Sequence, residues 1–323
     1  MTVKEKLLPM LFENTDRFIS GEEAAEKLGV SRTAVWKAVT KLKNDGYKIT
    51  AVTNKGYRLE DDCDLLNKAE IERLIGPLSD RLSITVEQTV TSTNAVLKEK
   101  ADGLQEGTVL IASEQTAGRG RFKRKFYSPA GNGIYMSIFL RPSLSAADSV
   151  LITTAAAAAV SLAAEELSGR KTEIKWVNDV LINGKKICGI LTEAALDIES
   201  GKLDYAVLGI GLNAYEQSGG FPDEIKDIAG AIFEKRENSL KNRLAAKVLT
   251  YFFKFYDMLE NRDFLTVYRE RSAVTGKKIL VISGDKKIPA TAVGIDGDCR
   301  LEVRYEDGRT EFLSSGEIST KLL

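Results

Sequence analysis

The pattern of apolar and polar positions at the start of the chain predicts two short helices joined by a tight turn. Ser20 and Glu23 have the spacing of a capping box, which begins a helix that runs to Leu28. Gly29 then turns the chain, and Ser31 caps a second helix. Apolar residues recur in this second helix at i, i+3, i+4 and i+7, namely at Val35, Ala38, Val39 and Leu42. This is the pattern of a helix-turn-helix whose second helix packs on a core through one face.

The opposite face of the second helix is polar and basic, as a recognition helix in the DNA major groove requires. Its outward residues are Arg32, Thr33, Lys37, Thr40, Lys41 and Asn44. We interpret Trp36, at the boundary of the two faces, as a partly buried packing residue, because tryptophan is highly buried on average. After Gly46 the residues alternate around a turn at 54–56, which predicts a hairpin wing. Lys55 and Arg58 on this wing would contact DNA phosphates.

Charge supports this interpretation. Between Lys27 and Arg58 the chain has eight basic residues and one acidic residue, Asp45, and this local excess favours a nucleic-acid partner. A basic helical module for protein interaction is the alternative. Residues 60–64 then reverse the charge, which we take as a linker. We therefore expect a winged helix-turn-helix DNA-binding domain over residues 1–66.

Residues 67–273 alternate strand-like and helix-like segments, which is typical of an α/β domain. Strands are expected at 82–88, 107–113, 133–140 and 172–177, and helices from Ser92 and over 145–167, 239–260 and 263–273. Hairpin signals at Asn183-Gly184 and Ser200-Gly201 predict antiparallel neighbours, so the sheet should be mixed. The alanine-rich helix, with a capping box at Ser145–Asp148, is interpreted as buried scaffold.

Short alternating runs separated by Gly-Asp and Asp-Gly turns occupy residues 274–323. They predict a small β-barrel of the SH3-like type, without a catalytic constellation of its own. The three predicted domains together make the fold class α+β, with a mixed α/β central domain.

Composition narrows the chemistry. A chain of 323 residues exceeds what a single core usually supports, and its 43% hydrophobic and 28% charged residues are those of an ordinary globular protein. We see no apolar run of the roughly 20 residues that a membrane span needs and no signal-peptide pattern, so we expect a cytoplasmic protein. The wide spacing of Cys63, Cys188 and Cys299 indicates reduced thiols. Histidine is absent, which excludes Ser-His-Asp hydrolysis and leaves positioning and charge as the means of catalysis.

A basic loop between two predicted buried strands is the strongest candidate for that chemistry. It contains Arg119, Arg121, Lys123, Arg124 and Lys125 within seven positions, beside Gly118 and Gly120. Glycines allow positive φ and close backbone approach, and guanidinium groups bind phosphate and carboxylate oxygens at two points. A solvated loop is the alternative for a bare basic run. The loop's place at a strand end favours an anion-binding site.

Five motifs that include this loop resemble the biotin protein ligase family. In order they are TSTN at Thr91–Asn94, GRGRFKRKFYSP at 118–129, KWVND at Lys175–Asp179, KKICGIL at Lys185–Leu191 and GIGLN at Gly209–Asn213. The amino-terminal segment makes the chain similar to the bifunctional members that also repress biotin synthesis. Phe126 stands where the family often has Trp, and KWVND replaces the more usual KWPND.

The resemblance implies which residues carry the function. Catalysis is expected from Arg121 and Lys186. The residues implied for biotin are Ser92, Thr93, Asn94, Gln115, Arg119, Gly120, Arg121, Lys186 and Gly189. Those implied for ATP and the adenylate are Arg119, Arg121, Arg124, Trp176, Asn178, Asp179 and Asn213. Without the resemblance, Ser92 could be a helix N-cap, Lys186 a solvated strand-edge lysine and Asn178 part of an Asx turn.

The implied reaction joins biotin to a lysine of a biotin carboxyl carrier protein through biotinoyl-5′-AMP, with ATP and Mg²⁺ as further requirements. The same adenylate would act as corepressor, favouring a homodimer on operator DNA of biotin synthesis genes. The metal ligands are left open.

Three other functions need weighing. A lipoate or octanoate transferase would share the architecture, but its motif includes a histidine and a glycine triplet that this chain lacks. A biotin sensor that binds DNA without turnover has the same sequence features as a ligase. Residues 209–214 match a dinucleotide fingerprint, but YEQSGGFP after them cannot form the helix that the fingerprint requires.

Overall fold

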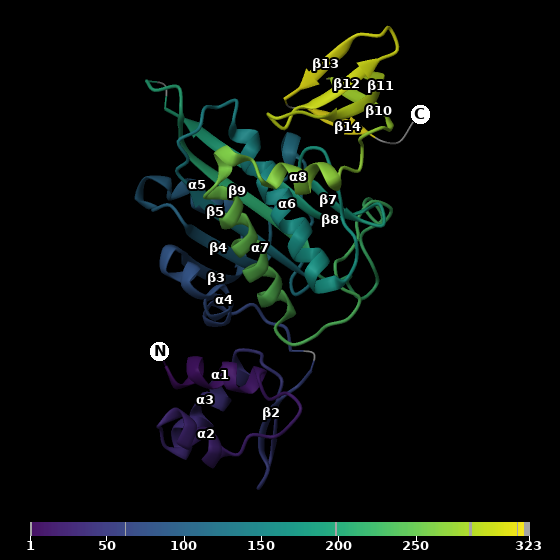
Figure 1. The fold of residues 1–323 in the computed structure, drawn as a ribbon. Helices are drawn as coiled ribbons and strands as arrows, with labels where there is room; N and C mark the ends of the chain where they lie inside the picture. The colour runs from purple at the N-terminus through teal and green to yellow at the C-terminus, as the bar shows by residue number, and fades with distance from the viewer. Residues whose placement is uncertain (1, 62, 198, 284–285, 315, 320–323) are drawn as a thin grey trace. The chain divides into compact units, whose positions relative to one another are not determined.

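The computed structural model describes residues 2–61, 63–197, 199–283, 286–314 and 316–319, and the chain forms two compact units (Figure 1). One unit consists of Met1–Gly76 with Glu234–Ala246, and the other of Pro77–Phe233 with Lys247–Leu323. The domain boundaries predicted at residues 66 and 273 remain predictions, because these units follow contacts in space and not the order of the sequence.

The first unit is a winged helix-turn-helix followed by one more helix. Its elements are α1 (Val3–Phe12), α2 (Gly21–Leu28), α3 (Arg32–Asn44), β1 (Ile49–Val52), β2 (Gly56–Leu59) and α4 (Lys68–Ile75). The hydroxyls of Ser20 and Ser31 cap α2 and α3, and Gly29 ends α2 with φ 65°, as the caps in the sequence predict. The four apolar residues predicted on the inner face of α3 are all buried. Helix α1, which the sequence analysis did not predict, adds Leu7 and Leu11 to this core.

Residues 60–64 are not the simple linker that their charge suggested. Cys63 is buried in the core of the first unit, and Asp64 is only 4% exposed. The Asp64 carboxylate accepts a 2.9 Å hydrogen bond from the backbone N–H of Lys241, at the start of α7 (Leu240–Tyr256). Nearby, the Asn242 side chain binds backbone groups of Leu65 and Asn67. Part of the acidic run therefore serves as a helix cap, where a carboxylate is favoured by the helix dipole.

The second unit is built on a seven-stranded mixed sheet, which confirms the predicted fold class. The strand order is β3-β4-β5-β9-β8-β7-β6, with β3 and β4 parallel and all other neighbours antiparallel. The strands are β3 (Ser83–Val90), β4 (Thr108–Gln115), β5 (Gly133–Leu140), β6 (Glu173–Lys175), β7 (Asp179–Ile182), β8 (Lys185–Leu196) and β9 (Leu203–Asn213). Asn183 and Gly184 both have positive φ in the β7–β8 hairpin, as a type I′ turn requires.

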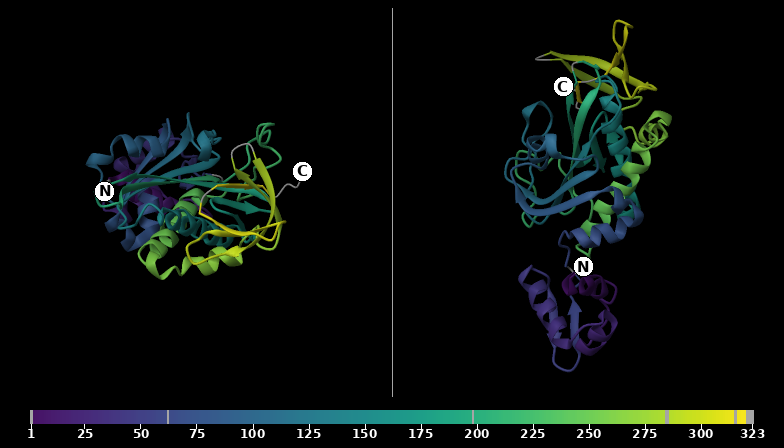
Figure 2. Two further views of the ribbon diagram at one scale, coloured as in Figure 1. Left: turned by 90° about the horizontal axis from the view of Figure 1, so that it is seen from above. Right: turned by 90° about the vertical axis from the view of Figure 1, so that its left-hand side faces the viewer.

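Helices cover both faces of this sheet (Figure 2). The helices of the unit are α5 (Thr93–Glu99), α6 (Ser149–Ser168), the part of α7 after Ala246, and α8 (Phe264–Glu270). On β8, Thr192 bonds Thr153 of α6, whereas the next residue, Glu193, bonds Asn94 of α5. Because successive side chains of a strand point to opposite faces, α5 and α6 lie on opposite sides of the sheet. The functional cavity described below lies on the α5 side.

Helix α6 starts later than the sequence predicted and is more apolar than expected. Ser145 and Asp148 do bond each other, but they form a turn that precedes the helix, which begins at Ser149. By length and composition alone this helix could cross a membrane, so the expectation that no apolar run reaches that length is wrong. Its apolar window is 72% buried inside the fold, as in the core helix of a globular domain.

The carboxyl-terminal strands form a five-stranded antiparallel sheet. They are β10 (Lys278–Ser283), β11 (Lys286–Ile295), β12 (Leu301–Tyr305), β13 (Thr310–Leu313) and β14 (Glu317–Ser319), in the order β13-β12-β11-β10-β14. The last strand returns to pair with the first, as in an SH3-like fold. The Cys299 carbonyl of this sheet accepts a 3.0 Å hydrogen bond from the indole of Trp176, and Arg269 donates to the Ile295 carbonyl at 2.8 Å.

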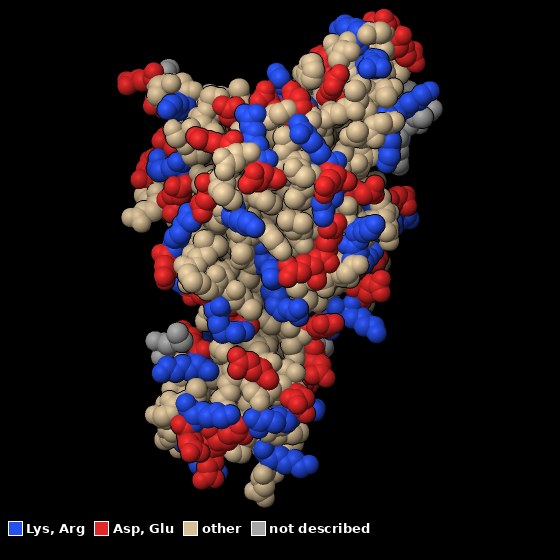
Figure 3. Space-filling view, in the orientation of Figure 1, with Lys and Arg blue, Asp and Glu red and all other residues tan. Residues whose placement is uncertain are grey.

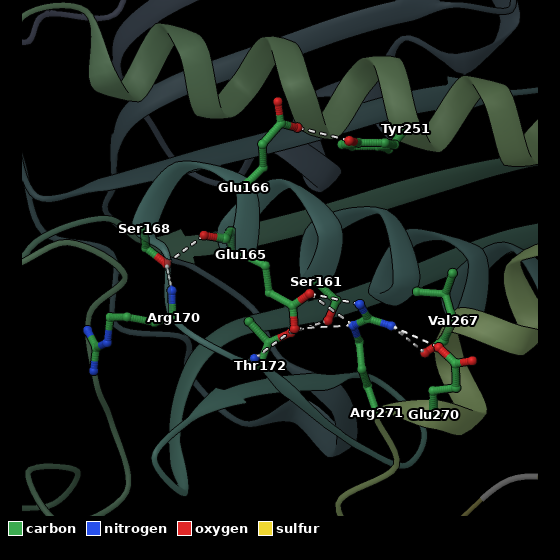
Figure 4. A network of polar contacts seen from close by, with 11 residues as sticks. Ser161, Glu165, Glu166, Ser168, Arg170, Thr172, Tyr251, Val267, Glu270 and Arg271 are labelled. Atoms are coloured by element: carbon green, nitrogen blue, oxygen red, sulfur yellow. Dashed lines mark hydrogen bonds and ion pairs between the residues drawn. The ribbon is translucent and has the colours of Figure 1, made fainter.

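A partly buried ion pair between Arg271 and Glu165 holds the segment that connects α8 to β10 (Figure 4). Arg271, just after α8, binds the carboxylate of Glu165 on α6 with Nη2 to Oε2 at 2.8 Å. Thr172 donates to the same carboxylate from its backbone N–H and its hydroxyl, both at 3.0 Å. Burial by itself raises the pKa of Glu165, but the hydrogen bonds from Arg271 and Thr172 outweigh it and hold that pKa below its usual value.

We expect Glu165→Gln to lower the free energy of unfolding at pH 7 by about 1–2 kcal/mol, since charge-assisted hydrogen bonds are lost. The folded-state pKa of Glu165 is depressed, so its contribution is present above the unfolded value of about 4.3 and disappears as the pH falls through the folded value. The free energies of unfolding of wild type and variant, measured by urea unfolding, should therefore converge in acid. Asp204→Asn, in the more exposed Arg141–Asp204 pair, is the matched control and should change stability by less than about 0.5 kcal/mol. A gap between Glu165→Gln and wild type that does not narrow in acid would contradict this account.

Candidate functional site

A small cavity opens where α5 begins, beside the basic loop and the strands β8 and β9. Its volume is about 50 Å³. Ten of the residues predicted from the sequence line it: Ser92, Thr93, Asn94, Gln115, Arg119, Gly120, Arg121, Asn178, Lys186 and Gly189. The other lining residues, to which no role was assigned from the sequence, are Phe126, Tyr135, Met136, Ile190, Leu191, Gly209, Ile210 and Gly211. Tyr135 and Met136 belong to β5, whereas the other six lie inside the motifs at 118–129, 185–191 and 209–213, and this is the signal that could have found them.

Polar side chains at the start of α5 form one end of the cavity. Ser92 occupies the N-cap position, yet its hydroxyl makes no cap hydrogen bond and is nearly buried. The Gln115 amide oxygen takes over part of that task, accepting from the backbone N–H of Thr93 at 2.9 Å. The Ser92 hydroxyl is therefore left for the cavity, and the simple N-cap interpretation of Ser92 does not account for its side chain.

Asn94 is held entirely by protein groups. Its Nδ2 donates to the Leu191 carbonyl at 3.2 Å and to Glu193 Oε2 at 2.9 Å, while its Oδ1 lies 2.6 Å from the hydroxyl of the fully buried Ser137. Glu193 also binds Lys98 at 2.6 Å. Burial raises the pKa of Glu193, but the hydrogen bonds from Lys98 and Asn94 outweigh this and leave the pKa lowered. This cluster braces the start of α5 against the sheet.

The basic loop is a closed, hydrogen-bonded turn. Gly120 N–H donates to the Arg124 carbonyl at 2.8 Å, and Phe126 N–H donates to the Gly118 carbonyl at 3.0 Å. Positive φ occurs at Phe122 and Lys123 and not at the loop glycines that were expected to adopt it. A Cβ on Gly118 would lie 2.4 Å from the Phe126 carbonyl oxygen, so this glycine is needed for close packing.

Arg121 and Lys186 bring positive charge to the same cavity. Arg121 Nη1 donates to Asn178 Oδ1 at 3.1 Å, which ties the loop to the end of the KWVND motif. Lys186 Nζ lies 2.6 Å from Asp179 Oδ1, and both side chains are only partly exposed. The cations are thus positioned by neighbouring polar groups, which keeps their charge in place for an anion.

Phe126 packs on a strip of sheet that has no side chains. A Cβ on Gly211 would be 2.4 Å from the Phe126 ring, and one on Gly189 would be 3.0 Å from that ring. Gly209 is bare for a different reason, because a Cβ there would be 2.3 Å from Asn94 Oδ1. Protein side chains therefore occupy the space above these glycines, which leaves a cavity of about 50 Å³, smaller than the roughly 300–1,000 Å³ of most ligand pockets.

Four predicted nucleotide contacts do not line the cavity. Trp176 is 3% exposed and its indole N–H is bonded to the Cys299 carbonyl. Asn213 donates to the carbonyls of Lys186 and Gly230, which is a structural role. Arg124 is exposed on the loop, and Asp179 pairs with Lys186. Nucleotide binding by these four residues remains a prediction.

The predicted DNA-contacting residues lie on the surface of α3 and the wing. Arg32, Thr33, Lys37, Thr40, Lys41, Asn44 and Lys55 are all exposed. Arg58 is half-buried, with its guanidinium 5.1 Å from the centre of the Phe18 ring. The expectation for Trp36 is wrong: this side chain is 57% exposed, because Val35, Ala38, Val39 and Leu42 already fill the inner face of the helix. Figure 3 shows both signs of charge over the molecule, consistent with its net charge of zero.

The fold and the site define a chain with a winged-helix unit and an α/β unit, and the cavity of the α/β unit is lined by neutral polar side chains and by Arg119, Arg121 and Lys186. Family models match all three segments: the Biotin/lipoate A/B protein ligase family over residues 86–213, an HTH domain over 3–58 and the Biotin protein ligase C terminal domain over 274–321. The chain belongs to the biotin protein ligase family.

Curated relatives support this assignment over most of the chain. The Bifunctional ligase/repressor BirA of Bacillus spizizenii is 38% identical over 267 residues, covering 82% of this chain and 80% of the relative. The protein of the same name from Escherichia coli is 29% identical, covering 99% and 98%. Among solved structures, the biotin protein ligase of Aquifex aeolicus in complex with biotin and ATP has a TM-score of 0.61 at 28% identity, covering 73% of this chain and 97% of that one.

We expect Gly211→Ala to lower the free energy of unfolding by about 1–3 kcal/mol, because its new methyl group collides with the Phe126 ring. Removing the ring relieves the collision, so the double variant Gly211→Ala/Phe126→Ala should be more stable than the sum of the two single changes implies. Urea unfolding of the four proteins measures this coupling. Gly103→Ala, where a Cβ meets nothing within 4 Å, is the control and should be nearly neutral. Strict additivity would show that Phe126 does not rest on this strip.

Proposed function

We propose that the protein is a biotin protein ligase that also represses transcription. The α/β unit activates biotin with ATP: a carboxylate oxygen of biotin attacks the α-phosphorus, pyrophosphate leaves, and biotinoyl-5′-AMP forms. The ε-amine of a lysine on a biotin carboxyl carrier protein then attacks the acyl carbon and AMP leaves. Family membership and the relatives' names support the two activities, and the site supports the distribution of roles.

The observation that carries the proposal is that neutral polar side chains and cationic side chains line the same cavity. Ser92, Thr93 and Gln115 offer neutral donors and acceptors at the start of α5, which suits the uncharged ureido ring of biotin. Arg121 and Lys186 offer positive charge at the other end, which suits a carboxylate and a phosphate. A ligand that is polar at one end and anionic at the other fits this distribution.

Each charged group then has a distinct task. We assign Lys186 to the reacting carboxylate and the α-phosphate, where it stabilises the charge that develops as pyrophosphate leaves. Arg121 holds the phosphate and, through Asn178, keeps the loop closed over the adenylate. Asn94 and Glu193 maintain the position of the α5 N-terminus without reacting. Catalysis by pre-positioned charge does not need a histidine, and the sequence contains none.

Magnesium would arrive with the nucleotide. Within the described residues no three His, Cys, Asp or Glu side chains cluster as metal ligands. Mg²⁺ usually keeps several waters and needs only one or two carboxylates beside the phosphates, so the carboxylate of Asp179 would be sufficient. When bound, the ion neutralises phosphate charge and assists departure of pyrophosphate.

The winged-helix unit supplies the repressor activity. The matching HTH domain and the exposed basic residues of α3 support binding to operator DNA of biotin synthesis genes. We further propose that the adenylate acts as corepressor by ordering the basic loop and favouring a homodimer, which would match a two-fold operator.

The first test separates a ligase from a sensor that binds biotin without turnover. We expect Lys186→Ala to reduce the rate of biotin-dependent pyrophosphate release from ATP by roughly 100-fold or more, since a pre-positioned charge is removed from the transition state. Lys185→Ala is the control, because the neighbouring lysine is exposed and bonds only a carbonyl, that of Lys226, at 3.3 Å. Wild-type protein without pyrophosphate release would refute the ligase, and an unimpaired Lys186→Ala variant would refute the role of Lys186.

A second prediction concerns retention of the adenylate. Arg121→Gly removes the Arg121–Asn178 bond, so the loop should open and release biotinoyl-5′-AMP faster than wild type. Bystander proteins mixed with biotin, ATP and the variant should then become labelled on a biotin blot. Lys123→Gly removes an equal charge from an exposed position of the same loop and should not cause this labelling. Labelling confined to the carrier protein by both variants would mean that the loop is not the lid.

A further inference from the structure

The recognition helix presents a large aromatic side chain to solvent. Trp36 on α3 is 57% exposed. Within residues 2–61, as far as they are described, the other large hydrophobic side chain with such exposure is Val52, at 38%, on the wing strand β1. Both therefore lie on the helix and the wing, the elements for which DNA contact is proposed. Trp36 is not among the residues that form the hydrophobic core of the first unit, so this core does not require its indole to be buried.

The neighbours of Trp36 on α3 show which groups lie beside its exposed indole. Residues three and four positions apart share a helix face, so Arg32, Thr33 and Thr40 are its neighbours. The Thr40 hydroxyl donates to the Trp36 carbonyl at 3.0 Å, which turns it back onto the helix. The methyl group of Thr40 is then the part of this exposed side chain that remains for a partner. The indole and this methyl group belong to residues four positions apart and are therefore neighbours on the outer face of α3, where they make up what we call the apolar strip.

The charge around this strip indicates the kind of partner. No acidic residue occurs in α3, and Arg32, Lys37 and Lys41 are exposed around the strip. An apolar surface enclosed by cations matches a polyanion that carries an apolar group within its groove. In the major groove of DNA that group is the 5-methyl of thymine, which distinguishes thymine from the other bases.

We propose that Trp36 is a specificity-determining residue, which packs its indole on the methyl group of a thymine in each operator half-site. The inference rests on the proposed repressor function and adds the base that is read and the residue that reads it. The basic residues of α3 supply affinity through phosphates, whereas Trp36 supplies discrimination between bases.

The experiment begins with duplexes selected from a random pool by the full-length protein with biotin and ATP. Each thymine of the selected sequence is then replaced by uracil, which lacks only the methyl group. For wild type, one position per half-site should weaken binding roughly three- to tenfold, the scale expected for one buried methyl group. Trp36→Ala should bind the thymine and uracil duplexes equally, and Trp36→Phe should retain part of the discrimination. Thermal unfolding of both variants, expected close to wild type, shows that the fold is intact.

Lys37→Ala is the matched control on the same helix. It should weaken binding to both duplexes by the same factor and reduce the salt dependence by about one phosphate contact, while leaving the thymine preference intact. A Trp36→Ala variant that still prefers thymine would overturn the inference. Altered self-association of Trp36→Ala with unchanged discrimination would overturn it in favour of a protein contact. If selection enriches no duplex at all, the proposed repressor function fails, and this inference fails with it.

Discussion

A strip of sheet without side chains determines the geometry of the functional site. Gly189 and Gly211 face each other across β8 and β9, and Gly209 lies two residues earlier on the same face. Bare backbone lets the Phe126 ring and the Asn94 amide approach to distances that a Cβ would forbid. The contact of Phe126 positions the basic loop, and the contact of Asn94 positions the start of α5. Three residues that contribute no functional group thus decide where the functional groups lie.

The polar part of the site is organised by bonds within the protein. The Asn94 amide donates to Glu193 and accepts from Ser137, and Gln115 accepts from the backbone at the start of α5. Buried polar groups that are fully paired cannot relax without leaving a partner unsatisfied, so this network holds the α5 N-terminus rigidly. The Ser92 hydroxyl stands apart because it makes no cap bond. Neutral polar groups and cations that are already in position can bind the reactants and stabilise developing charge without a histidine.

Much of the architecture and of the candidate site follows from the sequence. Caps at Ser20 and Ser31, the turn at Asn183-Gly184 and the alternation along the strands are local signals, because backbone hydrogen bonds and φ preferences depend on residues a few positions apart. The resemblance of five motifs to the biotin protein ligase family also identified ten cavity-lining residues, because it implies a binding role for each of them. The family comparison gives the same class of protein.

Only the tertiary structure decided which side chains fill the core and which polar groups are already hydrogen-bonded within the protein. Trp36 was expected inside, but its neighbours on α3 complete the core. Trp176 was expected in the nucleotide site, but its indole is bonded to Cys299, 123 residues away. Asp64 caps a helix 177 residues away, and Phe126 covers Gly189 of β8 and Gly211 of β9. Such outcomes depend on partners that periodicity and local propensity do not specify, because packing is settled between segments that only the folded chain brings together.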